Sequence, residues 1–132
     1  MDRCKVRRAR GMPVRSLSSS VFRWPDAQTV DQALRDWAEK VVRDREDVLR
    51  IGYFGSYARG DWGVGSDLDL VVIVEESHRP FERRSVEWDA TVLPVPVDVL
   101  VYTRREWQVL SQQGRFCQVS REAIWVYLKD EL

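Results

Sequence analysis

Two short apolar segments of the sequence are rich in β-branched residues. One ends at a Gly-Ser pair, and the other begins within a pair of aspartates. The segment Val48–Phe54 reads VLRIGYF and leads into Gly55-Ser56, while residues 68–75 read LDLVVIVE and begin inside an aspartate pair. Segments of this length and composition predict β-strands with buried side chains. Ten residues separate Ser56 from Asp67. The chain therefore places a glycine turn at one strand end and two carboxylates at another.

The aspartate pair predicts a binding site for a hard cation. Side chains two apart in a strand point to the same face, so Asp67 and Asp69 project together while Leu68 and Leu70 face a core. Two adjacent carboxylates repel each other, and a bound cation removes that cost. Oxygen ligands favour Mg²⁺ or Mn²⁺ over zinc. Together with a turn tight enough to approach phosphate oxygens, the pattern indicates phosphoryl chemistry on a nucleotide.

A third carboxylate lies in residues 95–102, which read VPVDVLVY with Asp98 as the only charge. Burying an aspartate in an apolar strand is costly unless it is paired, hydrogen-bonded or bound to metal. If this strand lies beside the Asp67/Asp69 strand, the three carboxylates converge. Two metal ions held there would clamp the attacking and leaving oxygens of an in-line displacement. Asp98 would also accept the proton of an attacking hydroxyl.

These elements together resemble a known superfamily. Gly55-Ser56, the ten-residue spacing, Asp67-Leu68-Asp69 and the later Val-Asp-Val around Asp98 are similar to the nucleotidyltransferases that include DNA polymerase β and the aminoglycoside nucleotidyltransferases. The sequence GSYARG…SDLDLVV most resembles the minimal members of this superfamily. These are the MNT-domain proteins, which are paired as antitoxins with HEPN-domain ribonucleases. The resemblance covers residues 26–132. It implies an α/β (α+β) nucleotidyltransferase fold, a mixed β-sheet with helices packed mainly on one face.

The resemblance also implies roles for individual residues. Gly55 and Ser56 would bind the triphosphate of ATP, Asp67 and Asp69 would bind Mg²⁺ or Mn²⁺, and Asp98 would be the third catalytic and metal-binding carboxylate. The implied reaction is transfer of AMP from ATP to a tyrosine hydroxyl of a HEPN-domain toxin, the expected partner. Two alternatives stay open: an antitoxin that acts by binding alone, and a small-molecule nucleotidyltransferase that works with a separate helical subunit.

Neighbouring residues have two interpretations each. Arg59 either contacts phosphate or forms a salt bridge with Asp61 or another surface acid. Ser66 either hydrogen-bonds the phosphate or shapes the turn before the aspartates, and we favour the turn. Trp62 lies in the loop DWGVG. We expect it to pack against the protein rather than stack on a base.

Charge divides the chain into an arm and a domain. The first fifteen residues carry six basic residues against one acid, whereas the whole chain has a net charge of zero. We therefore predict a basic N-terminal arm, extended or disordered, over residues 1–25 and one domain over residues 26–132. The arm by itself does not establish nucleic-acid binding, which we do not expect. The sequence leaves homo-oligomerisation open.

The chain offers no sign of a membrane or export segment. No apolar run follows the basic arm, and none approaches the length of a membrane span. The two cysteines, Cys4 and Cys117, lack metal-ligand spacing. We expect reduced thiols and a cytoplasmic protein.

The rest of the chain alternates between predicted helices and strands. Thr29 begins a capping-box pattern, and apolar residues at helical spacing extend that helix to about Asp44. A second capping pattern begins at Thr103, and its helix runs through Leu110 and stops near Gly114. Short helices over 81–88 and 116–123 and an apolar edge segment over 124–128 complete the set. This alternation predicts a mixed α/β sheet.

Overall fold

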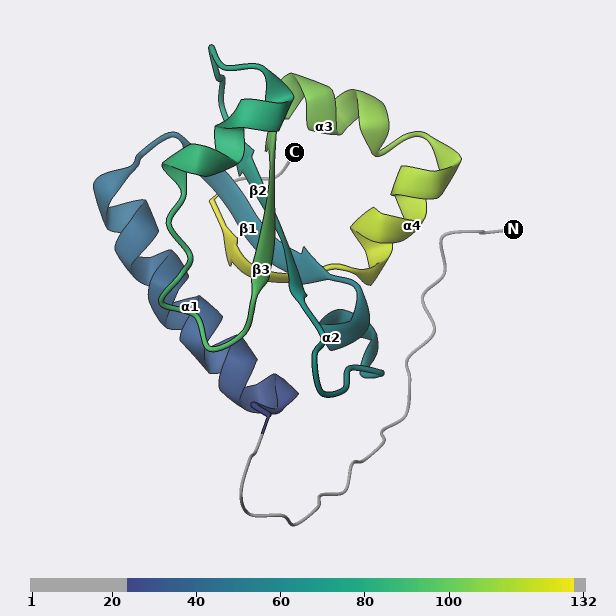
Figure 1. Ribbon diagram of the computed structural model, residues 1–132. Coiled ribbons are helices and arrows are strands. Elements are labelled where there is room, and N and C mark those ends of the chain that lie inside the picture. The colour runs from purple at the N-terminus through teal and green to yellow at the C-terminus, as the bar shows by residue number, and fades with distance from the viewer. Residues whose placement is uncertain (1–23, 130–132) are drawn as a thin grey trace.

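The computed structural model describes residues 24–129, so nearly all of the predicted basic arm lies outside the described part (Figure 1). In chain order the elements are α1 (Ala27–Asp44), β1 (Val48–Phe54), α2 (Ser56–Arg59), β2 (Leu68–Val74), the 3₁₀ helix η1 (Phe81–Glu87), β3 (Val97–Thr103), α3 (Arg104–Leu110), α4 (Gly114–Glu122) and β4 (Ile124–Leu128). The three apolar segments singled out in the sequence all form strands.

The four strands form one mixed sheet in the order β3-β2-β1-β4. β1 pairs antiparallel with both β2 and β4, whereas β2 and β3 are parallel. A parallel pair needs a crossover connection, and η1 with its flanking loops supplies it. The predicted fold class, a mixed sheet with helices, is confirmed.

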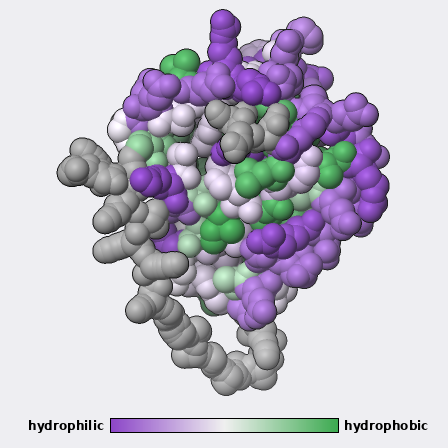
Figure 2. All heavy atoms as spheres, turned by 180° about the vertical axis from the view of Figure 1, so that it is seen from behind, coloured by the Kyte–Doolittle hydropathy of each residue, from purple (hydrophilic) through white to green (hydrophobic). Residues whose placement is uncertain are grey.

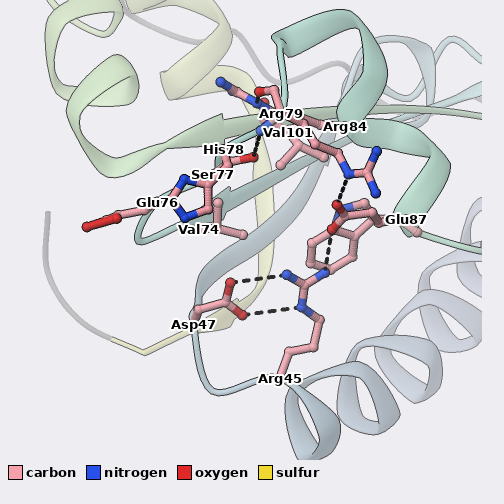
Figure 3. Close-up of a pocket in the computed structure, with 11 residues that line it drawn as sticks. Arg45, Asp47, Val74, Glu76, Ser77, His78, Arg79, Arg84, Glu87 and Val101 are labelled. Carbon is pink, nitrogen blue, oxygen red and sulfur yellow. Dashed lines mark hydrogen bonds and ion pairs between the residues drawn. The ribbon is translucent and has the colours of Figure 1, made fainter.

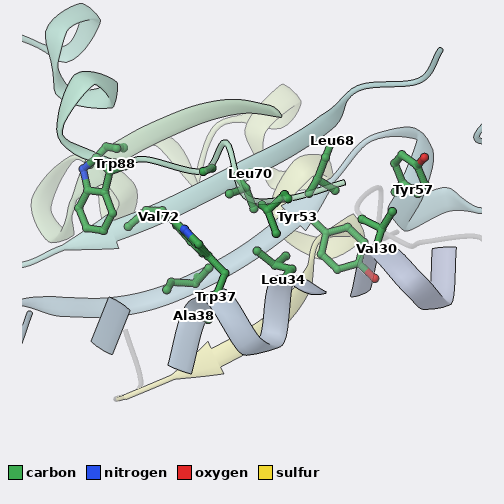
Figure 4. Close-up of a cluster of buried hydrophobic side chains, with 14 of the residues drawn as sticks. Val30, Leu34, Trp37, Ala38, Tyr53, Tyr57, Leu68, Leu70, Val72 and Trp88 are labelled. Carbon is green, nitrogen blue, oxygen red and sulfur yellow. The ribbon is translucent and has the colours of Figure 1, made fainter. Parts of the chain in front are cut away.

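α1 covers one face of the sheet and builds the larger core. Its buried side chains include Val30, Leu34 and Trp37, which pack against the even-numbered β2 residues Leu68, Leu70 and Val72 (Figure 4). The spacing of the three helix residues repeats at three to four positions, as one stripe of an amphipathic helix requires. The indole N–H of Trp37 also donates to the carbonyl of Asp89 over 2.9 Å.

α3 and α4 cover the opposite face, so the helices are divided between the two sides (Figure 1). A second core joins the odd-numbered β2 residues Val71 and Ile73 to Tyr102 and Trp107. We expected the helices to pack mainly on one face of the sheet. The longest helix, α1, covers one face, and the shorter helices α3 and α4 cover the other. A strand buried on both faces has a continuous apolar sequence, and residues 70–74 of β2 are such a run.

The first helix begins earlier than the capping-box pattern at Thr29 predicts. Asp26 is the N-cap residue, and its Oδ1 accepts a hydrogen bond from the Thr29 backbone N–H over 2.9 Å. Aspartate is as good an N-cap residue as threonine. Because Asp26 caps the helix, Thr29 lies within the first helical turn instead of preceding it. The predicted end at Asp44 and the capping box at Thr103 are both confirmed.

β4 forms one edge of the sheet and approaches β1 very closely. A Cβ added to Gly52 would lie 2.6 Å from Cε3 of Trp125 and 2.8 Å from the Ile124 carbonyl oxygen, so the packing requires glycine. Seen from behind, apolar residues gather in the middle of the molecule and hydrophilic residues surround them (Figure 2). Most residues of β4 are half-buried.

Two further expectations concern the chain as a whole. Cys117 is disulfide-bonded rather than the reduced thiol that we expected, and Cys4 lies outside the described residues. Among residues 24–129, no helix combines the length and the apolar composition needed to cross a membrane.

Candidate active site

The Gly-Ser turn brings the backbone directly against an aspartate. Gly55 has a φ of 81°, and a Cβ at this position would overlap Oδ2 of Asp69. Its carbonyl oxygen accepts hydrogen bonds from the N–H groups of Ala58 and Arg59 over 3.0 and 2.9 Å, which starts α2 immediately. Both the positive φ and the contact exclude larger residues. The end of β1 and the start of β2 therefore meet at one site.

Asp69 and Asp98 occupy directly neighbouring positions on two parallel strands. The register of β2 and β3 pairs Asp69 with Asp98, while Leu68 and Leu70 point away and are completely buried in the α1 core. The condition that these two strands lie side by side is thus met. Asp67 immediately precedes β2 and is exposed.

One premise about Asp98 was wrong. We expected a carboxylate buried in an apolar strand, but Asp98 is exposed and only Asp69 of the three is half-buried. β3 is an edge strand, and α3 begins only after its far end at Thr103. Solvent therefore reaches the aspartate end of this face, and Asp98 avoids the cost of burial.

The electrostatics of the site centre on Asp69. Burial raises the pKa of its carboxyl group above the ordinary value of 3.8, and the nearby charges of Asp98 and Asp67 raise it further, whereas Arg59 lowers it. Burial and like charges both disfavour the ionised form. A bound cation would relieve this repulsion.

The donor chemistry of the three aspartates fits a hard divalent cation, but the side chains are not preassembled around one. Among residues 24–129, no three acidic, histidine or cysteine side chains converge as a ready metal-binding group. The backbone register still brings Asp69 and Asp98 side by side. Their role as metal ligands stays a prediction.

Arg59 forms the salt bridges that we considered as its alternative role. Its Nε lies 3.1 Å from Oδ2 of Asp61, and its Nη1 lies 3.4 Å from Oε2 of Glu122. The same guanidinium lowers the pKa of Asp69, so its charge acts on the carboxylate site. Ion pairing and phosphate contact are both compatible with this position. The phosphate-binding role stays a prediction.

Ser66 and Trp62 have local roles. The hydroxyl of Ser66 accepts a hydrogen bond from the Gly63 N–H over 2.8 Å. The backbone N–H of Ser66 donates to the Gly63 carbonyl oxygen over 3.0 Å. These bonds close the turn before the aspartates, as we favoured. Trp62 stacks on Tyr57 with ring centroids 5.5 Å apart and packs against the α1 core.

Sequence analysis did not identify Glu122 as part of this neighbourhood. It lies at the end of α4, 63 residues beyond Arg59 in the chain, and its side chain is 14% exposed. No motif surrounds it in the sequence. Only the packing of α4 beside α2 brings the carboxylate to the site.

A cavity of about 520 Å³ opens at the opposite end of the sheet (Figure 3). Its walls carry an ion-pair cluster: Arg45 bonds both oxygens of Asp47 and reaches Glu87, which also pairs with Arg79. Arg84 forms two hydrogen bonds to Glu106. The guanidinium groups are thus bonded within the protein, and the cavity is far from the three aspartates.

Solved structures share this fold. The structure of a "putative nucleotidyltransferase" from Sulfolobus solfataricus superposes with a TM-score of 0.57, at 17% identity, over 78% of this chain and 84% of that one. A toxin–antitoxin structure with AMP-PNP gives a TM-score of 0.50, at 23% identity, over 70% of this chain and 72% of that one. Identities this low bear on the fold alone.

Curated relatives match about half of the chain. Two proteins of Methanocaldococcus jannaschii, each named "Putative protein adenylyltransferase", are 34% and 33% identical over 65 and 61 residues. The matched segments cover 47% and 46% of this chain but only 65% and 60% of those relatives. The family model for the nucleotidyltransferase domain matches residues 35–120, which include the Gly-Ser turn and all three aspartates. The chain therefore belongs to the nucleotidyltransferase domain family.

Proposed function

We propose that this protein transfers AMP from ATP to a hydroxyl group of a partner protein. The observation that carries the proposal is the in-register pair Asp69 and Asp98 with the Gly55 backbone against Asp69. This arrangement supplies a phosphate-approaching turn and an acidic site in one place. The names of the two relatives, protein adenylyltransferases, support AMP transfer as the reaction.

The residues divide the chemistry between binding and proton transfer. The Gly55-Ser56 turn would approach the triphosphate, and Asp67, Asp69 and Asp98 would hold Mg²⁺ or Mn²⁺. When bound, that cation would neutralise part of the negative charge on the phosphates. The acceptor oxygen attacks the α-phosphorus, the bond to pyrophosphate breaks, and pyrophosphate leaves with the bonding electrons. Asp98 accepts the proton of the attacking hydroxyl.

The acceptor in this proposal is a tyrosine of a HEPN-domain toxin, and the protein acts as its antitoxin in the cytoplasm. The similarity of the fold to a toxin–antitoxin structure with AMP-PNP supports a toxin partner. Exposure of Asp67 and Asp98 supports a macromolecular acceptor, because an open site can be approached by a protein surface.

Intact-mass spectrometry of the partner tests the reaction. A candidate HEPN-domain partner is incubated with this protein, ATP and Mg²⁺, and the mass of the partner should rise by one AMP group. Asp98→Asn should still form the complex yet transfer nothing, because removal of an interaction made mainly in the transition state reduces turnover more than affinity. A partner that is inhibited with unchanged mass would favour an antitoxin that acts by binding alone.

Calorimetry tests the cation requirement without a partner. ATP should bind in the presence of Mg²⁺ or Mn²⁺ and much more weakly in a chelating buffer, because three carboxylates alone repel the triphosphate. Metal-independent binding of equal strength would contradict the assignment of the aspartates as cation ligands.

A further inference from the structure

We propose that Glu122 is a positioning residue that holds the Arg59 guanidinium at the carboxylate site, ready to contact the phosphates of ATP. The inference rests on the proposed function for its consequence, nucleotide binding. The ion pair itself is a property of the free protein and can be tested without a nucleotide.

Arg59 lies where a cation is needed. It is the last residue of α2, three positions after Ser56, and Gly60 ends the helix directly behind it in the left-handed conformation. Its helix begins directly after Gly55, whose backbone lies against the Asp69 carboxylate. A phosphate group entering beside the Gly-Ser turn would therefore come close to this guanidinium.

Two acids compete to orient Arg59, and they differ in burial. Asp61 is 60% exposed and only two residues away in the chain, whereas Glu122 is 14% exposed and comes from α4. Exposed ion pairs are weakened by water and by salt, and they constrain a side chain little. A carboxylate mostly removed from water depends more strongly on its cation. The Asp61 contact is shorter, at 3.1 Å against 3.4 Å, but the Glu122 carboxylate is better shielded from water, and on that ground we assign it the orienting role.

The pair also joins two elements that the chain places far apart. In Figure 1 the end of α4 lies close to α2, just before the chain enters β4. Glu122 is the last residue of α4, so its backbone is held both by that helix and by the strand that follows. The anchor is thus part of the rigid framework, while Arg59 itself, with a side chain 47% exposed, remains able to reach a ligand.

Calorimetric titration with ATP and Mg²⁺ measures the consequence. Glu122→Ala should weaken ATP binding by about tenfold, the effect of one charge-assisted hydrogen bond. Glu122→Gln should recover most of the affinity, because the amide oxygen still accepts a hydrogen bond from Arg59. Asp61→Asn should have a smaller effect than Glu122→Ala. Glu39→Ala, which removes an acid from the exposed Glu39–Arg43 pair of α1, is the matched control and should leave binding unchanged.

A double-mutant cycle separates positioning from general damage. In an Arg59→Ala background, Glu122→Ala should weaken ATP binding no further, because the two residues act through one contact. An additional loss in that background would make Glu122 structural and overturn the proposal. Tighter ATP binding by Glu122→Ala would overturn it too, since Glu122 would then be a competitor of the phosphates. Unchanged binding by Arg59→Ala would have the same consequence.

Nuclear magnetic resonance of the free protein tests the ion pair independently. Restricted rotation of the Arg59 guanidinium should give separate Nη signals in the wild type, and these should merge in Glu122→Ala but remain separate in Glu39→Ala. Merged signals already in the wild type would refute the positioning role. If the signals behave as expected but the wild type binds no ATP, the proposed function fails while the positioning of Arg59 stands.

Discussion

At the scale of single residues, the site depends on how closely the backbone at Gly55 approaches Asp69. Two separate demands exclude a side chain at Gly55: its positive φ, and the Asp69 carboxylate, which occupies the space that a Cβ would need. The carboxylate could rotate aside, but it would then leave its place against the Gly-Ser turn. We therefore expect a side chain at Gly55 to affect transfer more than stability.

Substituting Gly55 separates these two demands. Gly55→Ala should cost about 1–3 kcal/mol of stability, because its φ of 81° and ψ of −153° lie in a region that glycine alone adopts readily. It should also reduce transfer by more than about a hundredfold through displacement of Asp69. Gly65→Ala is the matched control, because Gly65 has a φ of 90° but nothing within 4 Å of an added Cβ. Urea unfolding and turnover should show similar destabilisation in both and the large loss of activity only in Gly55→Ala. Equal activities would show that the contact with Asp69 is irrelevant.

Asp69 should destabilise the cation-free protein while remaining essential for transfer. Its pKa is raised above 3.8, mainly by burial and then by Asp98 and Asp67. A raised carboxyl pKa means that stability falls as pH rises from 3.8 through the folded-state pKa and stays lower above it. Asp69→Asn should remove this penalty, so its Tm in chelating buffer at pH 7 should equal or exceed that of the wild type.

Thermal unfolding with and without Mg²⁺ checks this expectation. Mg²⁺ should raise the Tm of the wild type and have much less effect on Asp69→Asn. Below pH 3.8 the two proteins should unfold at similar temperatures. A sharply lower Tm of Asp69→Asn at pH 7 without metal would instead make the aspartate a structural residue.

At the scale of elements, one ion pair connects η1, β3 and α3, between a buried Arg84 and a Glu106 side chain that is 39% exposed. Arg84, with a side chain 8% exposed, forms two hydrogen bonds to Glu106 and donates to the carbonyl of Val101. Glu106 also completes the capping box with Thr103. The crossover between the parallel strands is thereby attached to the start of the helix that follows β3.

Glu106→Gln should isolate the charge of this pair, because glutamine can preserve the capping box. The variant should lose about 1 kcal/mol at pH 7, since Arg84 then lacks a charged partner, while solvent already screens part of the charge on the half-exposed Glu106. Hydrogen bonds from Arg84 lower the pKa of Glu106 from 4.5. Its stabilising contribution is therefore complete above pH 4.5 and disappears as pH falls through the lowered pKa.

Urea unfolding between pH 3 and 7 provides the measurement. The difference in stability between wild type and Glu106→Gln should shrink toward low pH. Glu39→Gln, at a pair whose side chains are 65% and 69% exposed, should change stability by less than about 0.5 kcal/mol at any pH. A difference for Glu106→Gln that is constant with pH would exclude the charge as its cause.

At the scale of the whole molecule, the two ends of the sheet have different roles. The end of β1 and the starts of β2 and β3 carry the aspartates, while the other end carries the ion-pair cluster around the cavity of Figure 3. There the guanidinium of Arg45 lies 4.2 Å from the Trp88 ring centroid and also bonds Asp47. This cluster joins the turn after α1 to the end of η1.

Arg45→Ala should therefore affect stability and leave nucleotide binding unchanged. The expected loss is about 1–2 kcal/mol, from the cation–π contact and the half-exposed ion pairs together. Arg43→Ala, at an exposed position of α1, is the control and should lose far less. Chemical unfolding and ATP titration on the same samples check both. A changed ATP affinity in Arg45→Ala would show that the two ends are coupled.

Much of the fold could be predicted because it depends on residues adjacent in the chain. The β-branched runs became strands, alternation placed Leu68 and Leu70 in the core opposite Asp69, and the capping box at Thr103 started α3. The Gly-Ser and aspartate motifs also indicated the family that the domain match establishes. Each of these features is a short-range pattern, in which side-chain direction follows from backbone periodicity.

Only the tertiary structure decided which distant residues meet. Strand order and register placed Asp98 beside Asp69, and the edge position of β3 left Asp98 in water rather than buried. The packing of α4 beside α2 brought Glu122 to Arg59 across 63 residues. Such contacts depend on how separate elements pack, and an isolated glutamate at a helix end carries no local pattern that specifies its partner. The sequence by itself determined the elements and the chemical groups, and long-range packing determined their arrangement into a site.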